Sequence, residues 1–460
     1  MSADAPTQDD GTAPSRRTAP PAPGHGALDA PAARLEVDPL LDDPRTRIVV
    51  CCGSGGVGKT TTAAALGVRA AERGRKAVVL TIDPARRLAQ SMGISELDNV
   101  PRRVKGVDES AGGELHAMML DMKRTFDEIV EAHADGERAR AILENPFYQS
   151  LSAGFAGTQE YMAMEKLGQL RTRDAWDLII VDTPPSRSAL DFLDAPKRLG
   201  SFLDGKFIRV LMAPAKAGGR AGMKFLNVGM SMMTGTLSKI MGGQLLRDVQ
   251  TFAAAMDTMF GGFRTRADAT YRLLQAPGTA FLVVAAPERD ALREAAYFVE
   301  RLAAEQMPLA GLVLNRVHGS GAAQLSAERA LAAAEALSEP SDARSENLGG
   351  DGIVDLEAGK ADSRTADGPS PAAADPSTTD DSPSAARLAA GLLRLHAERM
   401  HVLARERRTR DRFTALHPEV PVAEIAALPG DVHDLAGLRA IGERLAVQER
   451  GAEESGDGEG

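Results

Sequence analysis

Eight consecutive residues, Gly53–Thr60, carry the strongest chemical signal in the chain. Their sequence, GSGGVGKT, fits the phosphate-binding pattern GxxxxGK(S/T) at every fixed position, after an apolar segment and before a helical one. Glycines let successive backbone N–H groups converge on phosphate oxygens, and Lys59 would bring a positive charge to the β- and γ-phosphates. An ordinary glycine-rich turn is the alternative, against which the complete match weighs. The predicted nucleotide-binding residues are Gly53, Ser54, Gly55, Gly56, Val57, Gly58, Lys59, Thr60 and Thr61.

Two aspartates follow strand-like segments and complete the predicted chemistry. Asp83 follows KAVVLTI, and Asp182 ends DLIIVD. Phosphoryl transfer needs carboxylates to hold the water shell of Mg²⁺ and to orient the attacking water, and the Thr60 hydroxyl is a candidate Mg²⁺ ligand. Taken alone, each aspartate could instead cap the element after it. Beside a phosphate-binding loop, we predict catalytic roles for Lys59, Asp83 and Asp182.

The nucleotide base is predicted to be adenine. Guanine-selective switches use an NKxD-type motif, whereas the comparable strand end here reads Asn315-Arg316-Val317-His318 and lacks the aspartate. Asn315 is a candidate base contact, and a strand-ending turn residue is the alternative. The expected cofactors are ATP and Mg²⁺.

The elements that would position these residues alternate between strand and helix. Apolar strands are predicted at 46–52, 76–82, 177–182, 279–285 and 309–315, with a helix over 59–72. Short buried strands separated by helices indicate an α/β fold with a mostly parallel central sheet flanked by helices. Residues 114–168 and 199–265 read instead as a helical subdomain inserted above the nucleotide site.

Three polar segments divide the chain into the expected domains. Residues 1–43, 338–384 and 448–460 contain few large apolar side chains and are predicted to be disordered. The P-loop domain is therefore expected to comprise residues 44–337, followed after the insertion by a basic helix and a return to the sheet over 385–447.

Composition limits the possible partners and compartment. The formal net charge of −10 offers no general basic field for a nucleic acid, so no nucleic-acid partner is expected. No segment approaches the roughly 20 apolar residues that cross a bilayer, so membrane contact is expected to be at most peripheral. Cys51 and Cys52 are the two cysteines, and we expect them to be small buried hydrophobes. With no secretory signature at the start, these features predict a cytoplasmic protein.

Several nested motifs resemble the arsenite-pump and tail-anchored-protein-targeting ATPase family, in its bacterial branch. The resemblance covers most of residues 46–336 and 386–446, and its motifs are GSGGVGKTTTAAALG, TIDPARRLAQSMG, AGTQEYMAMEKL, VDTPPSRSALDFLDAP, PERDALREA with GLVLNRV, and GDVHDLAGL. It implies a dimeric switch that hydrolyses ATP and couples nucleotide state to a hydrophobic protein segment or partner. It also implies that Asp83 orients the hydrolytic water, that Asp182 binds magnesium through water, and that Asn315 contacts adenine.

One departure from the family pattern concerns the dimer. The family's deviant Walker A motif has a lysine at its second position that reaches the partner's nucleotide, and here that position is Ser54. A charge of this kind can change the rate by about 10³–10⁵-fold. The chain is therefore expected to be either a slow homodimer or a weakly catalytic subunit of a heterodimer whose lysine-bearing paralogue completes the site.

Two further departures concern switch II and metal chemistry. Arg187 stands where the family has a glycine, and the zinc-binding CxxC pair and the arsenite cysteine triad of family members are absent. Arsenite pumping is therefore weakly supported.

Two helical segments offer candidate interaction surfaces. Eight of the 17 methionines lie within 199–265 and could form a groove for a hydrophobic client helix, or the core of the subdomain itself. The arginine-rich helix over 387–412 could contact a partner, an anionic membrane or RNA, although a solvated helix face is the more ordinary reading. Glu160 is a candidate sensor of the nucleotide or the partner subunit, and a buried residue at a helix start is the alternative.

Overall fold

An eight-stranded sheet forms the centre of the chain in this computed structural model, with strand order β3-β4-β2-β5-β1-β6-β7-β8. The structure describes residues 33–82, 87–95, 97–146, 148–149, 158–184, 262, 265–338 and 382–446. The strands are β1 (Ile48–Cys52), β2 (Lys76–Thr81), β3 (Arg102–Arg103), β4 (Glu114–Met119), β5 (Leu178–Asp182), β6 (Thr279–Ala285), β7 (Leu309–Val317) and β8 (Val422–Ala426).

The sheet is parallel except at one edge, where the short β3 runs antiparallel to β4. This confirms the predicted α/β fold class. All five predicted strands are present, with ends that move by no more than two residues, and the helix predicted over 59–72 is α2 (Lys59–Glu72). Because parallel strands need crossover connections, the sequence alternates strand and helix around β1.

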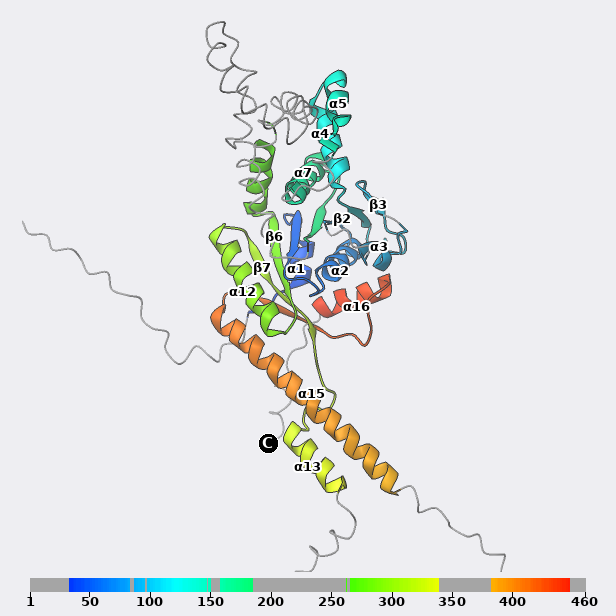
Figure 1. Ribbon diagram of the computed structural model, residues 1–460, viewed down its shortest axis with the longest axis vertical. Coiled ribbons are helices and arrows are strands. Elements are labelled where there is room, and N and C mark those ends of the chain that lie inside the picture. The colour runs from blue at the N-terminus through cyan, green and yellow to red at the C-terminus, as the bar shows by residue number, and fades with distance from the viewer. Residues whose placement is uncertain are drawn as a thin grey trace, which may run out of the picture.

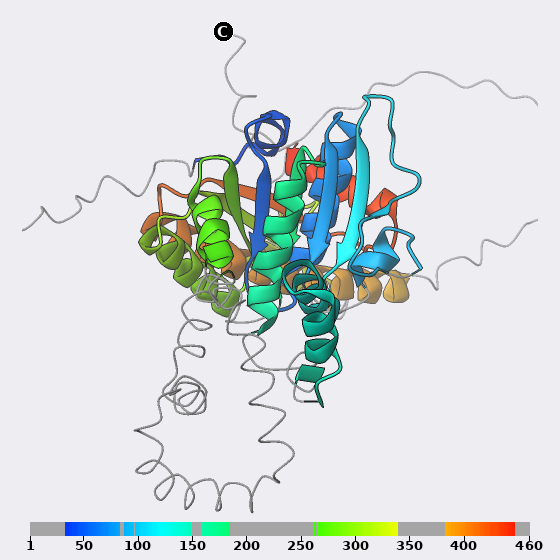
Figure 2. The ribbon, with the colours of Figure 1, turned by 90° about the horizontal axis from the view of Figure 1, so that it is seen from above.

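Helices cover both faces of the sheet (Figures 1 and 2). Successive residues of β1 point to opposite sides, so that Ile48 and Val50 enter one core cluster and Val49 and Cys51 the other. One face packs against α4 (Met122–His133), α5 (Gly136–Leu143), α7 (Thr158–Arg173) and α12 (Arg289–Ala304). The other packs against α1 (Val37–Asp42), α2, α3 (Arg87–Ser91) and α16 (Leu435–Ala446). Burial on both faces explains why these strands are apolar throughout.

Two helices form an arm that projects from the core (Figure 1). We use "the arm" for α13 (Ala327–Ser338) together with the whole of α15 (Ser382–Leu416), which packs along it. Four buried alanines allow the two helices to approach closely: Ala330, Ala334, Ala390 and Ala397. The far end of α15 is anchored to the core by buried Phe413 and by an ion pair from Arg410 to Glu424. The predicted helix over 387–412 is thus confirmed and is longer at both ends.

Two expectations are wrong at their boundaries. Residues 114–119 do not belong to a helical region but form β4, which pairs with β2 and buries Leu115, Ala117 and Met118 against both layers of helices. The stretch just before residue 44 is also ordered, because α1 buries Val37 and Leu41 against the core and Asp38 pairs with Arg69 at 2.5 Å. The sequences of β4 and α1 are too short to show a clear periodicity, and both elements are stabilised by their contacts with the core.

Several expectations fall outside the described residues. These are the disordered assignments for residues 1–32, 339–381 and 447–460, the methionine-rich stretch as far as residue 261, Asp83 and Arg187. In the part of the chain that the structure describes, no helix is both long enough and apolar enough to cross a bilayer.

Candidate nucleotide-binding site

The glycine-rich loop connects β1 to α2 and has a backbone that side chains would disrupt. Gly58 has φ +97° and caps α2, and Gly56 has φ +78°. A Cβ atom on Gly53 would lie 2.1 Å from the Val284 carbonyl oxygen, and one on Gly58 would lie 2.2 Å from Asn315 Nδ2. At Gly56, in contrast, a Cβ would meet nothing within 4 Å. The loop is therefore tightly held from below and open on its outer side.

Lys59 lies beneath this open loop. Its residue is only 5% exposed, and its Nζ donates a hydrogen bond to the Ser54 carbonyl oxygen at 2.8 Å. The bond joins the two ends of the loop. The ammonium group therefore sits where an anion on the loop would gain both its charge and its hydrogen bonds.

Asp182 brings three elements together at the carboxyl edge of the sheet. The residue is fully buried, and its Oδ2 accepts hydrogen bonds from Thr60 Oγ1 at 2.7 Å and from Thr81 Oγ1 at 2.8 Å. Thr60 lies in the first turn of α2, Thr81 ends β2 and Asp182 ends β5. Carboxylate and hydroxyl oxygens are the ligand type that Mg²⁺ takes. Thr60 and Asp182 were expected here from the sequence, whereas Thr81 belongs to no site motif and joins them only through the pairing of β2 with β5.

Asn315 also reaches the loop, although from the side of the sheet. Its Nδ2 donates to the Val57 carbonyl oxygen at 2.8 Å, and its Oδ1 accepts from the Arg316 backbone N–H at 2.9 Å. Arg316 takes φ +62°, which turns the chain so that the second bond can form. The structure thus places Asn315 as a support for the loop, and its contact with adenine stays a prediction.

The start of α7 touches the segment that leads to Asp83. Gln159 Nε2 donates to the Ile82 carbonyl oxygen at 2.8 Å, immediately before that aspartate. The neighbouring Glu160 is partly buried, and its Oε2 has no hydrogen-bond partner among the residues that the structure describes. A change in the conformation of the segment after Ile82 would therefore alter the contact that this segment makes with the first turn of α7.

The cysteines of β1 lack the features of reactive thiols. Both are free and buried, and burial raises the pKa of Cys52 to about 12. Burial also raises the pKa of Cys51 well above its usual value, and the charge of Asp182 adds to this. A thiol with so high a pKa is almost entirely protonated at neutral pH, and the described residues contain no cluster of three potential metal ligands from His, Cys, Asp and Glu. These observations agree with the prediction that both cysteines act as small hydrophobes.

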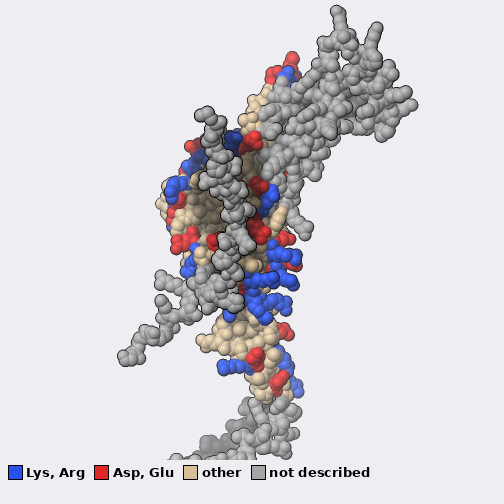
Figure 3. Space-filling model, turned by 90° about the vertical axis from the view of Figure 1, so that its left-hand side faces the viewer, with Lys and Arg blue, Asp and Glu red and all other residues tan. Residues whose placement is uncertain are grey.

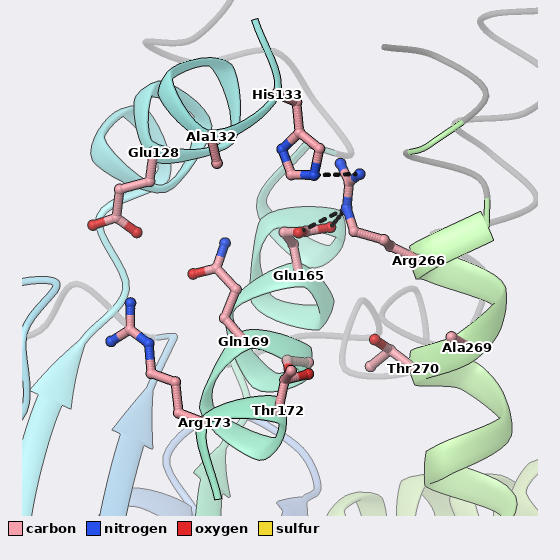
Figure 4. A pocket seen from close by; sticks show the side chains of 11 residues that line it. Glu128, Ala132, His133, Glu165, Gln169, Thr172, Arg173, Arg266, Ala269 and Thr270 are labelled. Carbon is pink, nitrogen blue, oxygen red and sulfur yellow. Dashed lines mark hydrogen bonds and ion pairs between the residues drawn. The ribbon is translucent and has the colours of Figure 1, made fainter. Parts of the chain in front are cut away.

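A separate hollow of about 480 Å³ opens between α4, α7 and helical residues 265–275 (Figure 4). Four of its titratable side chains have a partner within the hollow or beside it. Glu165 accepts from Arg266 Nε at 2.9 Å, Arg266 Nη1 lies 3.2 Å from His133 Nε2, and Glu128 pairs with Lys166 at 2.9 Å. Burial lowers the pKa of Lys166, and its bond to Glu128 acts in the opposite direction. We therefore assign the cluster to packing of the three helices.

Comparison of the whole sequence with known protein families agrees with the site formed by the glycine-rich loop, Lys59 and Asp182. The profile of the anion-transporting ATPase family matches residues 46–329, which is more than half of the chain. The chain belongs to this family. The match spans β1 to the start of α13, and so contains the glycine-rich loop, Asp182 and Asn315. The anion-transporting ATPases are ATP hydrolases, and this assigns the enzyme class and the nucleotide.

Individual members of the anion-transporting ATPase family are distant relatives. An ATPase GET3 from Podospora anserina is 26% identical over 297 residues, 63% of this chain and 80% of the relative. A putative arsenical pump-driving ATPase from Halobacterium salinarum is 31% identical over 202 residues, 41% of this chain and 29% of the relative. An ATPase ASNA1 homolog 2 from Paramecium tetraurelia is 23% identical over 286 residues, 60% and 78% of the two chains.

Proposed function

We propose that the chain is a Mg²⁺-dependent ATPase that works as a dimeric switch. The observation that carries this proposal is the convergence of Thr60 and Thr81 on the buried Asp182 carboxylate, beneath the same loop that holds Lys59. These three side chains fit a magnesium–nucleotide complex, because hydroxyl and carboxylate oxygens are ligands of Mg²⁺. The adjacent loop has space for phosphates, since a Cβ atom on Gly56 would meet nothing within 4 Å.

The roles of this chain's residues follow from their positions. The backbone of Gly55–Thr60 would hold the phosphates, and Lys59 would exchange its bond to the Ser54 carbonyl for phosphate oxygens. Thr60 and, through water, Asp182 would hold Mg²⁺, which supplies charge neutralisation at the phosphates when it is bound. Asp83 would orient the attacking water. Asn315 would keep the loop in position by its bond to Val57.

Asp182→Asn is expected to reduce ATP turnover by about 10²-fold while the protein stays folded. Asparagine keeps a side-chain oxygen for the hydroxyls of Thr60 and Thr81 but removes the negative charge that Mg²⁺ requires. The measurement is steady-state phosphate release at several Mg²⁺ concentrations.

Asp177→Asn serves as the matched control for that substitution. Asp177 precedes the same strand at its opposite, exposed end, where its Oδ2 accepts from the Lys76 backbone N–H. Turnover should stay unchanged in this control. Native turnover in Asp182→Asn, with an unaltered Mg²⁺ dependence, would contradict the assignment of the metal site.

The second part of the proposal is that nucleotide state controls the binding of a hydrophobic segment or partner. It is supported by the link from Gln159 to the Ile82 carbonyl, because this bond joins the segment before Asp83 to α7, which packs against α4. The family membership and the methionine-rich sequence of 199–265 add to this support. The alternative is a weakly catalytic subunit of a heterodimer, favoured by the serine at position 54.

A hydrophobic fluorescent dye is expected to bind differently to the protein with Mg·ADP and with a non-hydrolysable Mg·ATP analogue. Because Gln159→Leu removes the bond to the Ile82 carbonyl, it should reduce this difference in dye binding at least about threefold. ATP binding, measured without the dye, should persist in this variant. Gln169→Leu, on the same helix and without a hydrogen bond between described residues, is the matched control. Equal dye binding in both nucleotide states of the native chain would exclude the coupling, even if ATP hydrolysis is normal.

A further inference from the structure

The arm carries an excess of positive charge, which lies on α15. Helix α15 contains eight arginines against three acidic residues, within a chain of net charge −10. Glu406 pairs with His318 and Asp411 with Arg410, while Glu398 is exposed and forms no ion pair with the described residues. The other seven arginines are exposed and form no ion pair within the described part of the chain: Arg387, Arg394, Arg399, Arg405, Arg407, Arg408 and Arg412.

The contacts that these arginines do make are with neutral groups. Arg394 donates to Ser338 Oγ, Arg399 to the Gly319 carbonyl and Arg408 to the Ala404 carbonyl. Figure 3 shows Lys and Arg side chains gathered where the core narrows into the arm. Concentrated charge of one sign on an acidic protein needs an anionic counterpart to lower its free energy.

An apolar stripe lies beside this charge. Leu388, Leu392 and Leu395 are 68%, 59% and 63% exposed, and Val402 is 44% exposed. Their spacing of four, three and seven residues keeps them on one side of the helix. The buried Ala390 and Ala397, which face α13, lie on another side. Among the described residues, none covers this stripe.

We propose that the arm docks on an anionic lipid surface. The leucine stripe would enter the boundary between headgroups and acyl chains, and the arginines would lie at the lipid phosphates. Arg399 stands within the stripe, and on docking its guanidinium would exchange its bond to the Gly319 carbonyl for a lipid phosphate while its methylenes stay among the apolar side chains.

The charges disfavour the other occupants of the stripe. A second copy of this chain, packed stripe to stripe, would bring Arg399 into an apolar seam and set rows of arginine beside each other. A nucleic acid would satisfy the arginines but would leave the leucines in water. An anionic bilayer surface satisfies both groups at once.

Sedimentation of the full chain with lipid vesicles tests this proposal. The vesicles contain phosphatidylglycerol and phosphatidylcholine in a roughly 1:2 ratio, with pure phosphatidylcholine as the neutral comparison. The triple variant R387Q/R405Q/R412Q should bind the anionic vesicles about 10²-fold more weakly, at roughly fivefold for each charge. The triple variant L388Q/L392Q/L395Q should lose at least about tenfold. All six side chains are solvent-exposed, so the melting temperature should stay unchanged.

The matched control removes three arginines from the core surface. Arg138, Arg272 and Arg289 are exposed and have no side-chain partner among the described residues, so R138Q/R272Q/R289Q changes the net charge equally and should bind the anionic vesicles like the native chain. Equal weakening by this control, absence of binding to the anionic vesicles, or full binding by the leucine variant would each overturn the proposal. So would a leucine variant that changes only the oligomeric state, or arginine-dependent binding to duplex DNA in place of vesicles. None of these measurements involves ATP turnover.

Discussion

Ser54→Lys is expected to raise ATP turnover of the isolated chain by about 10³-fold or more. The native serine cannot place a positive charge near the phosphates of a second subunit, whereas lysine has both the charge and the reach. Position 54 is suited to this substitution, since the residue is partly exposed and adjoins the exposed Gly55 and Gly56. The bond from Lys59 uses the backbone carbonyl of Ser54, so a new side chain leaves it in place.

The measurement is phosphate release per subunit over a range of protein concentrations. Because the new lysine would act across a dimer, its effect should increase with concentration until the dimer is saturated. Ser54→Gln is the control, as it adds length and polarity but no charge, and it should not accelerate turnover. If the native chain alone already turns over at the rate of the lysine variant, Ser54 is a harmless substitution and the heterodimer alternative is lost.

Lys59→Ala should lower ATP turnover by about 10²–10³-fold. Its ammonium group is buried beneath the loop, where the low local dielectric strengthens its attraction for phosphate oxygens. The loss should appear in the turnover of the bound nucleotide and in weaker binding of ATP, which isothermal titration measures separately. Removal of its bond to the Ser54 carbonyl should lower the melting temperature only slightly.

Lys76→Ala is the corresponding control. Lys76 begins β2, at the end of the strand away from Thr81 and the site, and forms a surface ion pair with Glu114 at 2.7 Å. A surface pair of this kind contributes little to stability. Turnover should therefore match that of the native chain. Unchanged turnover in Lys59→Ala would show that this loop is not the catalytic nucleotide site, whatever the family membership implies.

The fold class, the glycine-rich loop and the polar residues at the strand ends can be predicted from the sequence alone. Each of these depends on contiguous residues: GSGGVGKT forms a local turn whose backbone angles only glycine adopts readily, and the apolar runs of β1 and β5 need no distant information to be recognised. The same holds for α2 and for the long α15, whose patterns repeat over many turns.

Which polar side chains contact each other at the site depends on the tertiary structure. Thr81 gave no motif signal, yet pairing of β2 with β5 places its hydroxyl on the Asp182 carboxylate. Asn315 was predicted as a base contact, and the close packing of β7 behind the loop gives it a bond to Val57. Strand β4 and helix α1 were not predicted from the sequence. Their stability comes from burial against the core, and the sequence of a short segment does not show which residues will be buried. The open leucine stripe of the arm likewise became visible only when α13 and the core left that side of α15 uncovered.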